Sequence, residues 1–248
     1  MPSILAVSGS PSSTSRTASA ADHALTLLRA QGHTASHLAV RDLPSDDLLS
    51  GFRDTPALWS ATDAVAQADG IVIATPVYKA SYTGLLKAFL DLLPENALAG
   101  KVVLPLVTGG TIGHLLTIDY ALRPVLTALG ADHVVQGRFL LDSDIIRGEG
   151  GRTRLTPEAD RRLSDSVAAF TAALDRRTAT ATAAAPVLKL VTAGAPTSAS
   201  AATAATAVAA SASVAAAASA AASASASAST RFSAPVSTPT PATAGAAR

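Results

Sequence analysis

A loop rich in hydroxyl side chains follows the first apolar run of the chain, Ser3–Val7. Six of the eight residues from Ser10 to Thr17 are serine or threonine, and Arg16 stands among them. Apolar residues then recur at helical spacing up to Gly32. Backbone N–H groups at a helix N-terminus bind anions, and an arginine can hold two phosphate oxygens at once. The pattern predicts a phosphate site, and the alternative is that these hydroxyls only cap the helix.

A second loop with polar and aromatic side chains follows another apolar run. The run Ile71–Ala74 predicts a strand buried on both faces, and apolar residues at helical spacing continue up to Pro94. Between them, the segment Thr75–Tyr82 holds two tyrosines, a lysine and several hydroxyls. Ligands of open α/β sheets bind at such loops, at the carboxyl ends of strands. A flat aromatic ligand with a polar tail would suit this loop; the alternative is an ordinary strand-to-helix connection.

A third loop carries three glycines in five residues. It follows the apolar run Lys101–Val107 and extends from Thr108 to His114. Glycines at this density allow a ligand to approach the backbone closely. His114 is a candidate catalytic acid, and a surface or capping role is the alternative.

The helix predicted after His114 contains a proline. Pro124 has no N–H to donate to the carbonyl of Tyr120, so we expect a kink or a widened turn around Asp119 and Tyr120. Irregular turns of this kind often lie at functional surfaces.

The three loops need a sheet whose strands end at one edge. Five apolar runs alternate with helical patterns, which predicts an α/β fold: a doubly wound, five-stranded parallel sheet in the flavodoxin-like order 2-1-3-4-5.

We expect polar loops at residues 41–54 and 142–154. The pair Asp46 and Asp47 in the first of these loops is a candidate metal site, with a solvated loop as the alternative. The strands are expected at Ser3–Val7, Thr34–Val40, Ile71–Ala74, Lys101–Val107 and Asp132–Leu141, and the last helix at Pro157–Leu174.

The composition bounds the class of protein. The chain has 248 residues, a formal net charge of +1 and no cysteine. The charge gives no support for nucleic-acid binding, and disulfides and thiolate chemistry are excluded. No apolar run reaches transmembrane length and no signal peptide is recognisable, so we expect a cytoplasmic protein without a membrane contact. Alanine, serine, threonine and proline dominate after Thr178, which predicts a globular domain over residues 1–177 and a disordered tail over 178–248.

At the level of motifs, residues 3–176 resemble the NAD(P)H-dependent FMN reductases of two-component alkanesulfonate monooxygenase systems. The motifs that carry the resemblance are Gly9-Ser10-Pro11, Ser15-Arg16-Thr17, Thr75–Gly84, Lys101–Leu106, Thr108–Thr111, His114–Leu116 and Asp119–Leu122.

The resemblance implies a chemistry, a site and partners. Such enzymes reduce FMN with NADPH or NADH and pass the reduced flavin to a partner monooxygenase. The reactivity lies in the cofactors, so no catalytic side chain and no metal is expected. The resemblance implies a phosphate site at Ser10, Ser15, Arg16 and Thr17, and contacts to the ribityl chain and the ring from Pro76, Val77, Tyr78, Lys79, Thr108, Gly109, Gly110 and Thr111.

Two further points follow from the resemblance. It implies a homodimer or homotetramer with Tyr120 in a widened turn at the subunit interface. Relatives often carry an arginine and bulky residues after Gly-Ser-Pro, where this chain has Ser12, Ser13 and Thr14, which implies weaker FMN binding here. The alternatives are a quinone or azo reductase that retains FMN, and a flavodoxin-like electron carrier; such carriers are usually strongly acidic, unlike this chain.

Overall fold

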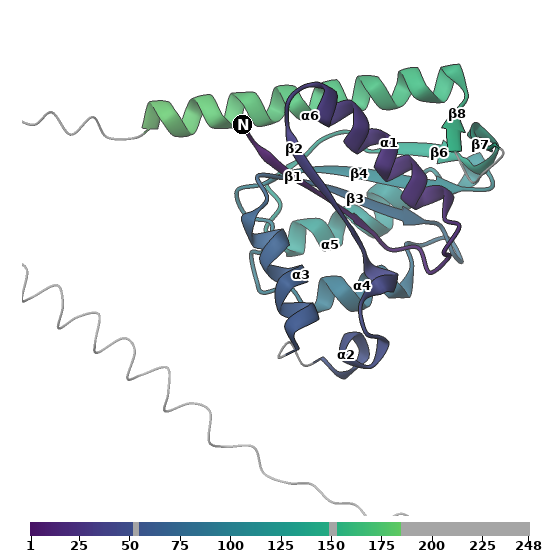
Figure 1. Ribbon diagram of the computed structural model, residues 1–248, viewed down its shortest axis with the longest axis horizontal. Coiled ribbons are helices and arrows are strands. Elements are labelled where there is room, and N and C mark those ends of the chain that lie inside the picture. The colour runs from purple at the N-terminus through teal and green to yellow at the C-terminus, as the bar shows by residue number, and fades with distance from the viewer. Residues whose placement is uncertain (52–54, 149–152, 185–248) are drawn as a thin grey trace, which may run out of the picture. The chain divides into compact units, whose positions relative to one another are not determined.

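A parallel sheet of six strands, two of which share the fifth position, forms the centre of the fold in the computed structural model, which describes residues 1–51, 55–148 and 153–184. The strand order is β2-β1-β3-β4-β5, and neighbouring strands pair in parallel (Figure 1). This confirms the predicted order and brings the carboxyl ends of β1, β3 and β4 together. The strands are β1 Ser3–Ser8, β2 Thr34–Ala39, β3 Gly70–Pro76, β4 Val102–Gly109 and β5 His133–Val134.

Helices cover both faces of the sheet. On one face α1 and α6 pack against Ile4, Ala6 and Val72; on the other, α3, α4 and α5 pack against Leu5 and Ile71 (Figure 1). Because successive side chains of a strand point to opposite faces, one apolar run supplies both cores. The helices are α1 Arg16–Ala30, α2 Ser45–Ser50, α3 Pro56–Gln67, α4 Gly84–Asp91, α5 Arg123–Ala128 and α6 Pro157–Ala184.

The fifth strand is interrupted, although the sequence predicted one continuous strand over Asp132–Leu141. The first piece, β5, pairs with the start of β4, and a second piece, β6 (Arg138–Leu141), pairs with its end. Pro105 of β4 lies opposite the gap. The backbone polar groups of every second residue of a strand point to the same neighbouring strand. The carbonyl of Val103 accepts from the N–H of Val135 in the fifth strand, so Pro105, two residues on, also faces that strand. Because proline has no N–H, it cannot donate a hydrogen bond to the fifth strand at this point.

The helix predicted after His114 is irregular where Pro124 requires it. A 3-10 turn, Ile112–His114, is followed by a π-helix, Ile118–Leu122, and then by α5. The N–H of Arg123 donates to the carbonyl of Ile118, five residues back, as in a widened turn. The predicted distortion around Asp119 and Tyr120 is thus confirmed.

Three segments differ from the expectation. The polar loop expected over 142–154 contains a 3-10 turn, Asp142–Asp144, and an antiparallel pair, β7 Ile145–Arg147 with β8 Thr153–Leu155. The loop expected over 41–54 contains α2 and a 3-10 turn, Val40–Asp42. Tertiary packing stabilises the short elements in these two loops, because Ile145 of β7 and Leu48 of α2 are buried, with 2% and 5% exposure. The last helix continues ten residues past Leu174, to Ala184.

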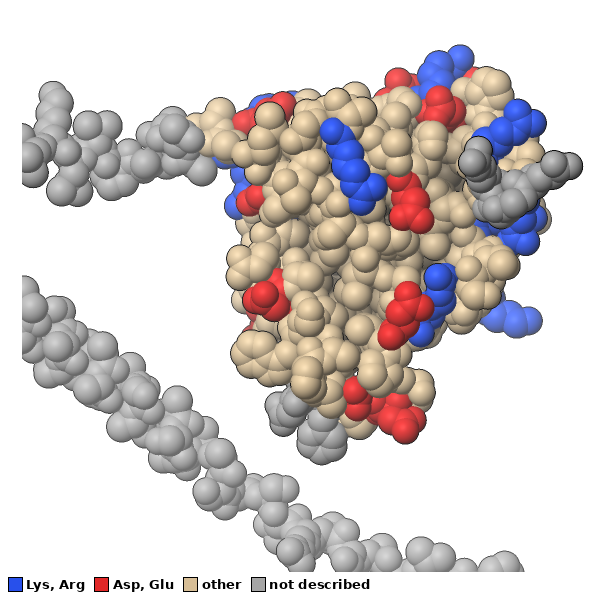
Figure 2. Space-filling model, viewed as in Figure 1, with Lys and Arg blue, Asp and Glu red and all other residues tan. Residues whose placement is uncertain are grey.

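Surface charge is mixed over the face seen in Figure 2, where acidic and basic side chains alternate, in keeping with a net charge of +1. Among the helices described, none combines the length and the apolar character needed to cross a membrane. The tail predicted from residue 178 onward falls largely outside the described residues, which end at 184.

Candidate functional site

The loops after β1, β3 and β4 meet at a polar cavity of about 190 Å³. Parallel strands place their carboxyl ends at one edge of the sheet, so segments more than ninety residues apart in sequence become neighbours. Seven of the predicted site residues line this cavity: Ser10, Ser15, Arg16, Thr17, Pro76, Tyr78 and Thr108. The remaining lining residues are Ser12, Thr14, Asp142 and Arg147.

The first loop is held against α4 by Gly9. The Gly9 N–H donates to the Ala74 carbonyl over 2.9 Å, and the Thr83 hydroxyl donates to the Gly9 carbonyl over 2.5 Å. A β-carbon on Gly9 would lie 2.4 Å from Cβ of Leu86, closer than side chains approach in proteins. Only glycine fits here, and the fit fixes the start of the hydroxyl-rich loop.

The N-terminus of α1 is arranged to bind an anion. Ser15 is the N-cap, and its hydroxyl accepts from the Ala18 N–H over 3.0 Å. The N–H groups of Arg16 and Thr17 belong to the first turn, where amides have no partner within the helix. Within the described chain, Nε of Arg16 is buried without a hydrogen-bond partner. Capping therefore accounts for the Ser15 hydroxyl, while unpaired donors remain at the cavity.

A strained turn forms the tip of the second loop. Tyr78 and Ser81 exchange backbone hydrogen bonds of 2.9 and 3.1 Å, while Lys79 and Ala80 have φ angles of 51° and 63°. Two consecutive positive φ angles define a turn of type I′, which normally takes Asn-Gly. Without glycine, this turn costs of the order of 1 kcal/mol per residue. Thr117 helps to hold it by donating to the Ala80 carbonyl over 3.2 Å.

The two tyrosines of the second loop take different positions. The side chain of Tyr78 is half exposed and lines the cavity. Tyr82 packs against the α3–α4 core, and burial raises the pKa of its phenol. Val77 is buried, and its N–H donates to the Thr108 carbonyl over 2.8 Å; neither Val77 nor Lys79 lines the polar cavity.

The third loop lies beside the polar cavity. A β-carbon on Gly109 would lie 3.1 Å from the ring of Phe139, so this glycine allows close packing of β6. Gly109, Gly110 and Thr111 do not line the polar cavity, although the neighbouring Thr108 does.

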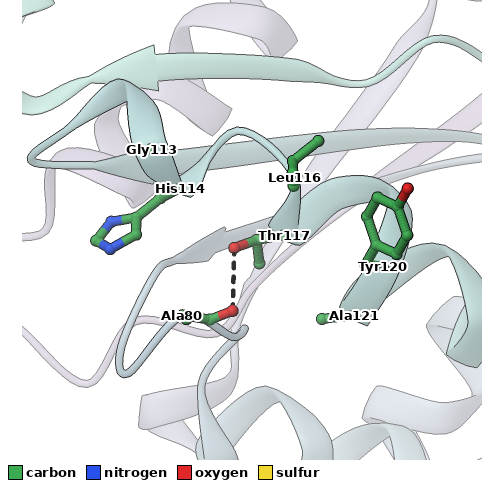
Figure 3. A pocket seen from close by; sticks show the side chains of 7 residues that line it. All are labelled: Ala80, Gly113, His114, Leu116, Thr117, Tyr120 and Ala121. Atoms are coloured by element: carbon green, nitrogen blue, oxygen red, sulfur yellow. Dashed lines mark hydrogen bonds between the residues drawn. The ribbon is translucent and has the colours of Figure 1, made fainter.

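A second, mostly apolar cavity of about 400 Å³ lies between the strained turn and the π-helix. In Figure 3, His114 and Tyr120 flank it, with the hydrogen bond from Thr117 to the Ala80 carbonyl between them. Nδ1 of His114 is buried without a partner among the described residues. The lining residues are Ala80, Gly113, His114, Leu116, Thr117, Tyr120 and Ala121.

The sequence did not point to Asp142 or Arg147 as site residues. Both come from the segment expected to be a plain loop. Asp142 directly follows β6, the continuation of the fifth strand, which offered a weak signal. Arg147 is brought to the cavity by the β7–β8 pair, which has no periodic pattern that could reveal it.

A family model described as NADPH-dependent FMN reductase matches residues 2–145. The chain belongs to this family. An FMN reductase (NADPH) of Pseudomonas putida is 45% identical over 175 residues, covering 70% of this chain and 89% of the relative. An FMN reductase (NADPH) of Escherichia coli is 45% identical over 174 residues, covering 70% and 91%.

A solved structure supports the same family. The apo form of the NADH:FMN oxidoreductase EMOB has a TM-score of 0.64 and 44% identity, and the match covers 70% of this chain and 90% of that one. The FMN reductase described here is thus an oxidoreductase of flavodoxin-like fold that uses FMN and a nicotinamide nucleotide.

Proposed function

We propose that this FMN reductase transfers a hydride from NADPH to FMN and supplies the reduced flavin to a partner monooxygenase. The arrangement that carries the proposal is the polar cavity, in which hydroxyls, helix N–H groups and Arg16 converge where the three loops meet. The motifs similar to reductases of two-component alkanesulfonate systems support the role of the partner. The two relatives that match over 70% of this chain are named for NADPH, whereas the EMOB structure is named for NADH, so the choice of NADPH follows the first two and is tested directly below.

The donor set of the polar cavity fits a phosphate. Its hydroxyls include those of Ser10, Ser15 and Thr17, and the buried Nε of Arg16 has no acceptor among the described residues. A phosphate offers several acceptor oxygens and negative charge, which unpaired N–H groups and the helix dipole favour. In this assignment the 5′-phosphate of FMN binds at the N-terminus of α1.

The other two loops would hold the ribityl chain and the ring. Pro76 and Tyr78 line the cavity, while Val77 precedes the strained turn and Lys79 lies within it. Thr108 reaches the cavity, and Gly109, Gly110 and Thr111 would border the ring beyond it. Bound FMN supplies the hydride acceptor; the protein stacks and orients the two flat rings. No side chain needs to act as a nucleophile in this reaction.

A subunit interface at the π-helix completes the proposal. Tyr120 is 79% exposed, and Leu116, one turn before it, is 59% exposed. Aromatic side chains are enriched at the centres of protein interfaces, and an exposed apolar pair is suited to such a contact. We assign this surface to the contact between copies in a homodimer or homotetramer.

The test is a steady-state assay of NADPH oxidation with and without added FMN. Turnover that depends on added FMN and saturates with it supports a reductase that releases its flavin. NADPH oxidation that needs a quinone or azo dye, with FMN remaining bound through gel filtration, would favour the quinone or azo reductase instead. Comparing kcat/KM for NADPH and NADH tests the nucleotide preference.

A further inference from the structure

A second cationic side chain, that of Arg147, lies at the proposed phosphate site and comes from a segment far from Arg16 in the sequence. Arg147 of β7 lines the same cavity as Arg16, Ser10 and Ser15. Its Nη2 donates to the carbonyl of Thr14 and lies 3.5 Å from the Thr14 hydroxyl. Arg147 therefore contacts the hydroxyl-rich loop at Thr14, directly before the N-cap of α1.

Three contacts fix the strand pair that carries Arg147. Ile145, two residues earlier, is 2% exposed in the core beneath α1 and α6. On the paired strand, the hydroxyls of Thr153 and Ser19 lie 3.1 Å apart, which ties β8 to α1. The Thr156 N–H donates to the Asp144 carbonyl over 2.9 Å. Arg147 is thus held over the N-terminal turn of α1.

Within the described part of the chain, the guanidinium of Arg147 has N–H donors without a hydrogen-bond partner. Both of its hydrogen bonds to the described residues use Nη2 and go to Thr14, and none is found for Nη1 or Nε. A guanidinium has five N–H donors arranged to bind two oxygens together. Nε of Arg16, in the same cavity, also has no partner in the described chain.

The charges at the cavity match a phosphate monoester. Two arginines and one aspartate, Asp142, line it, so the side chains carry a net positive charge. A phosphate monoester carries about −1.5 to −2 charges at pH 7, more than Arg16 alone neutralises. The Asp142 carboxylate disfavours an anion with only one cation beside it.

We propose that Arg147 is the second cationic ligand of the FMN 5′-phosphate and makes this enzyme select FMN over riboflavin. The inference rests on the proposed phosphate site. It reverses the expectation of weaker FMN binding drawn from Ser12, Ser13 and Thr14. Those positions carry no positive charge, but Arg147 on β7 places one at the same cavity.

The test compares FMN with riboflavin, which lacks the phosphate. Dissociation constants are measured by quenching of flavin fluorescence on the full chain, for wild type and Arg147→Gln. Since Arg147 is exposed, we expect a loss of FMN affinity near the lower end for a hydrogen bond to a charged group, roughly tenfold, with riboflavin unchanged. Arg154→Gln, on β8 and outside the cavity, removes the same charge and should change neither constant.

Two further readouts separate direct binding from support of the loop. Arg147→Lys retains the charge and should recover part of the affinity. The FMN affinity of Arg147→Gln should also fall less steeply with added salt, because one ion pair to the ligand is gone. A weakened FMN affinity with an unchanged salt dependence would mean that Arg147 only positions Thr14, and would overturn the proposal.

The other outcomes are equally distinct. Equal losses for FMN and riboflavin, unchanged FMN affinity, or a loss confined to the NADPH-to-NADH ratio would each overturn the role of Arg147. If the wild type itself binds FMN and riboflavin equally, the proposed phosphate site fails and this inference with it. If the wild type prefers FMN and Arg147→Gln keeps that preference, only the inference fails.

Discussion

The hydroxyl oxygens of Thr17 and Thr108 lie 2.6 Å apart and join the first turn of α1 to the end of β4. Both side chains are buried, with 2% and 1% exposure. Ninety-one residues separate them in sequence, so this bond links the first and third loops of the site directly. It fixes the distance between the proposed phosphate site and the loop assigned to the ring.

Removing one member of this pair should be costly. Thr108→Val leaves the buried Thr17 hydroxyl without its partner, so we expect the free energy of unfolding to fall by about 1–3 kcal/mol. The double variant Thr17→Val/Thr108→Val should lose less than the sum of the single losses, since neither hydroxyl is then left unpaired. Urea denaturation of all four proteins measures the coupling, and strictly additive losses would contradict it.

Arg16 should contribute to flavin binding through the phosphate. Arg16→Ala removes the donor whose Nε is buried without a partner in the described chain, and we expect FMN binding to weaken by about 1–3 kcal/mol. Arg29→Ala, in the last turn of the same helix, serves as the control because Arg29 contacts the Ala35 carbonyl away from the cavity. An unchanged dissociation constant for Arg16→Ala would place the phosphate elsewhere.

Gly9 should not tolerate a side chain. In Gly9→Ala the new carbon would lie 2.4 Å from Cβ and 3.1 Å from Cα of Leu86, so either the loop or α4 must shift. We expect a loss of about 1–3 kcal/mol in the free energy of unfolding, together with weaker FMN binding. Gly84→Ala is the matched control: its new carbon meets nothing within 4 Å at the start of α4, and stability should not fall. Equal thermal midpoints for the two variants would refute the packing argument.

Tyr120 should matter for assembly more than for the fold of the subunit. Its side chain is 79% exposed on the π-helix, so Tyr120→Ala removes little contact within one chain. We expect the oligomer to shift toward smaller species and the retention of FMN to change. Sedimentation velocity measures the first and flavin release the second. An unchanged sedimentation coefficient, with the fold intact by circular dichroism, would show that Tyr120 is not at the interface.

Truncation should separate α6 from the alanine-rich segment after it. Residues 185–248 hold few large apolar side chains, so removing them should leave folding and turnover intact. A shorter protein ending at 178 would also lose the last turns of α6 and should be somewhat less stable. Loss of folding or of the oligomeric state on removal of residues 185–248 alone would contradict the prediction that this segment is not needed for the fold.

Local patterns in the sequence determined the sheet, its order and most of the polar cavity. Apolar runs such as Ile71–Ala74, bounded by turn residues, predict central strands buried on both faces, and the hydroxyls in one loop before a helix predicted the residues that line the polar cavity. Pro124 lacks an N–H, so the widened turn at Tyr120 followed from covalent structure alone.

Tertiary structure decided three features that no local sequence pattern indicates: the break in the fifth strand, the β7–β8 pair and the position of Arg147. The break between β5 and β6 arises because Pro105, which has no N–H, faces the fifth strand and not β3. Which of the two strands it faces is decided only when the sheet is assembled. The β7–β8 pair has six residues in all, too few for a readable period, and is stabilised by the burial of Ile145 against α1 and α6. Arg147 reaches the cavity only because that packing exists, so its place beside Arg16 could be found only in three dimensions.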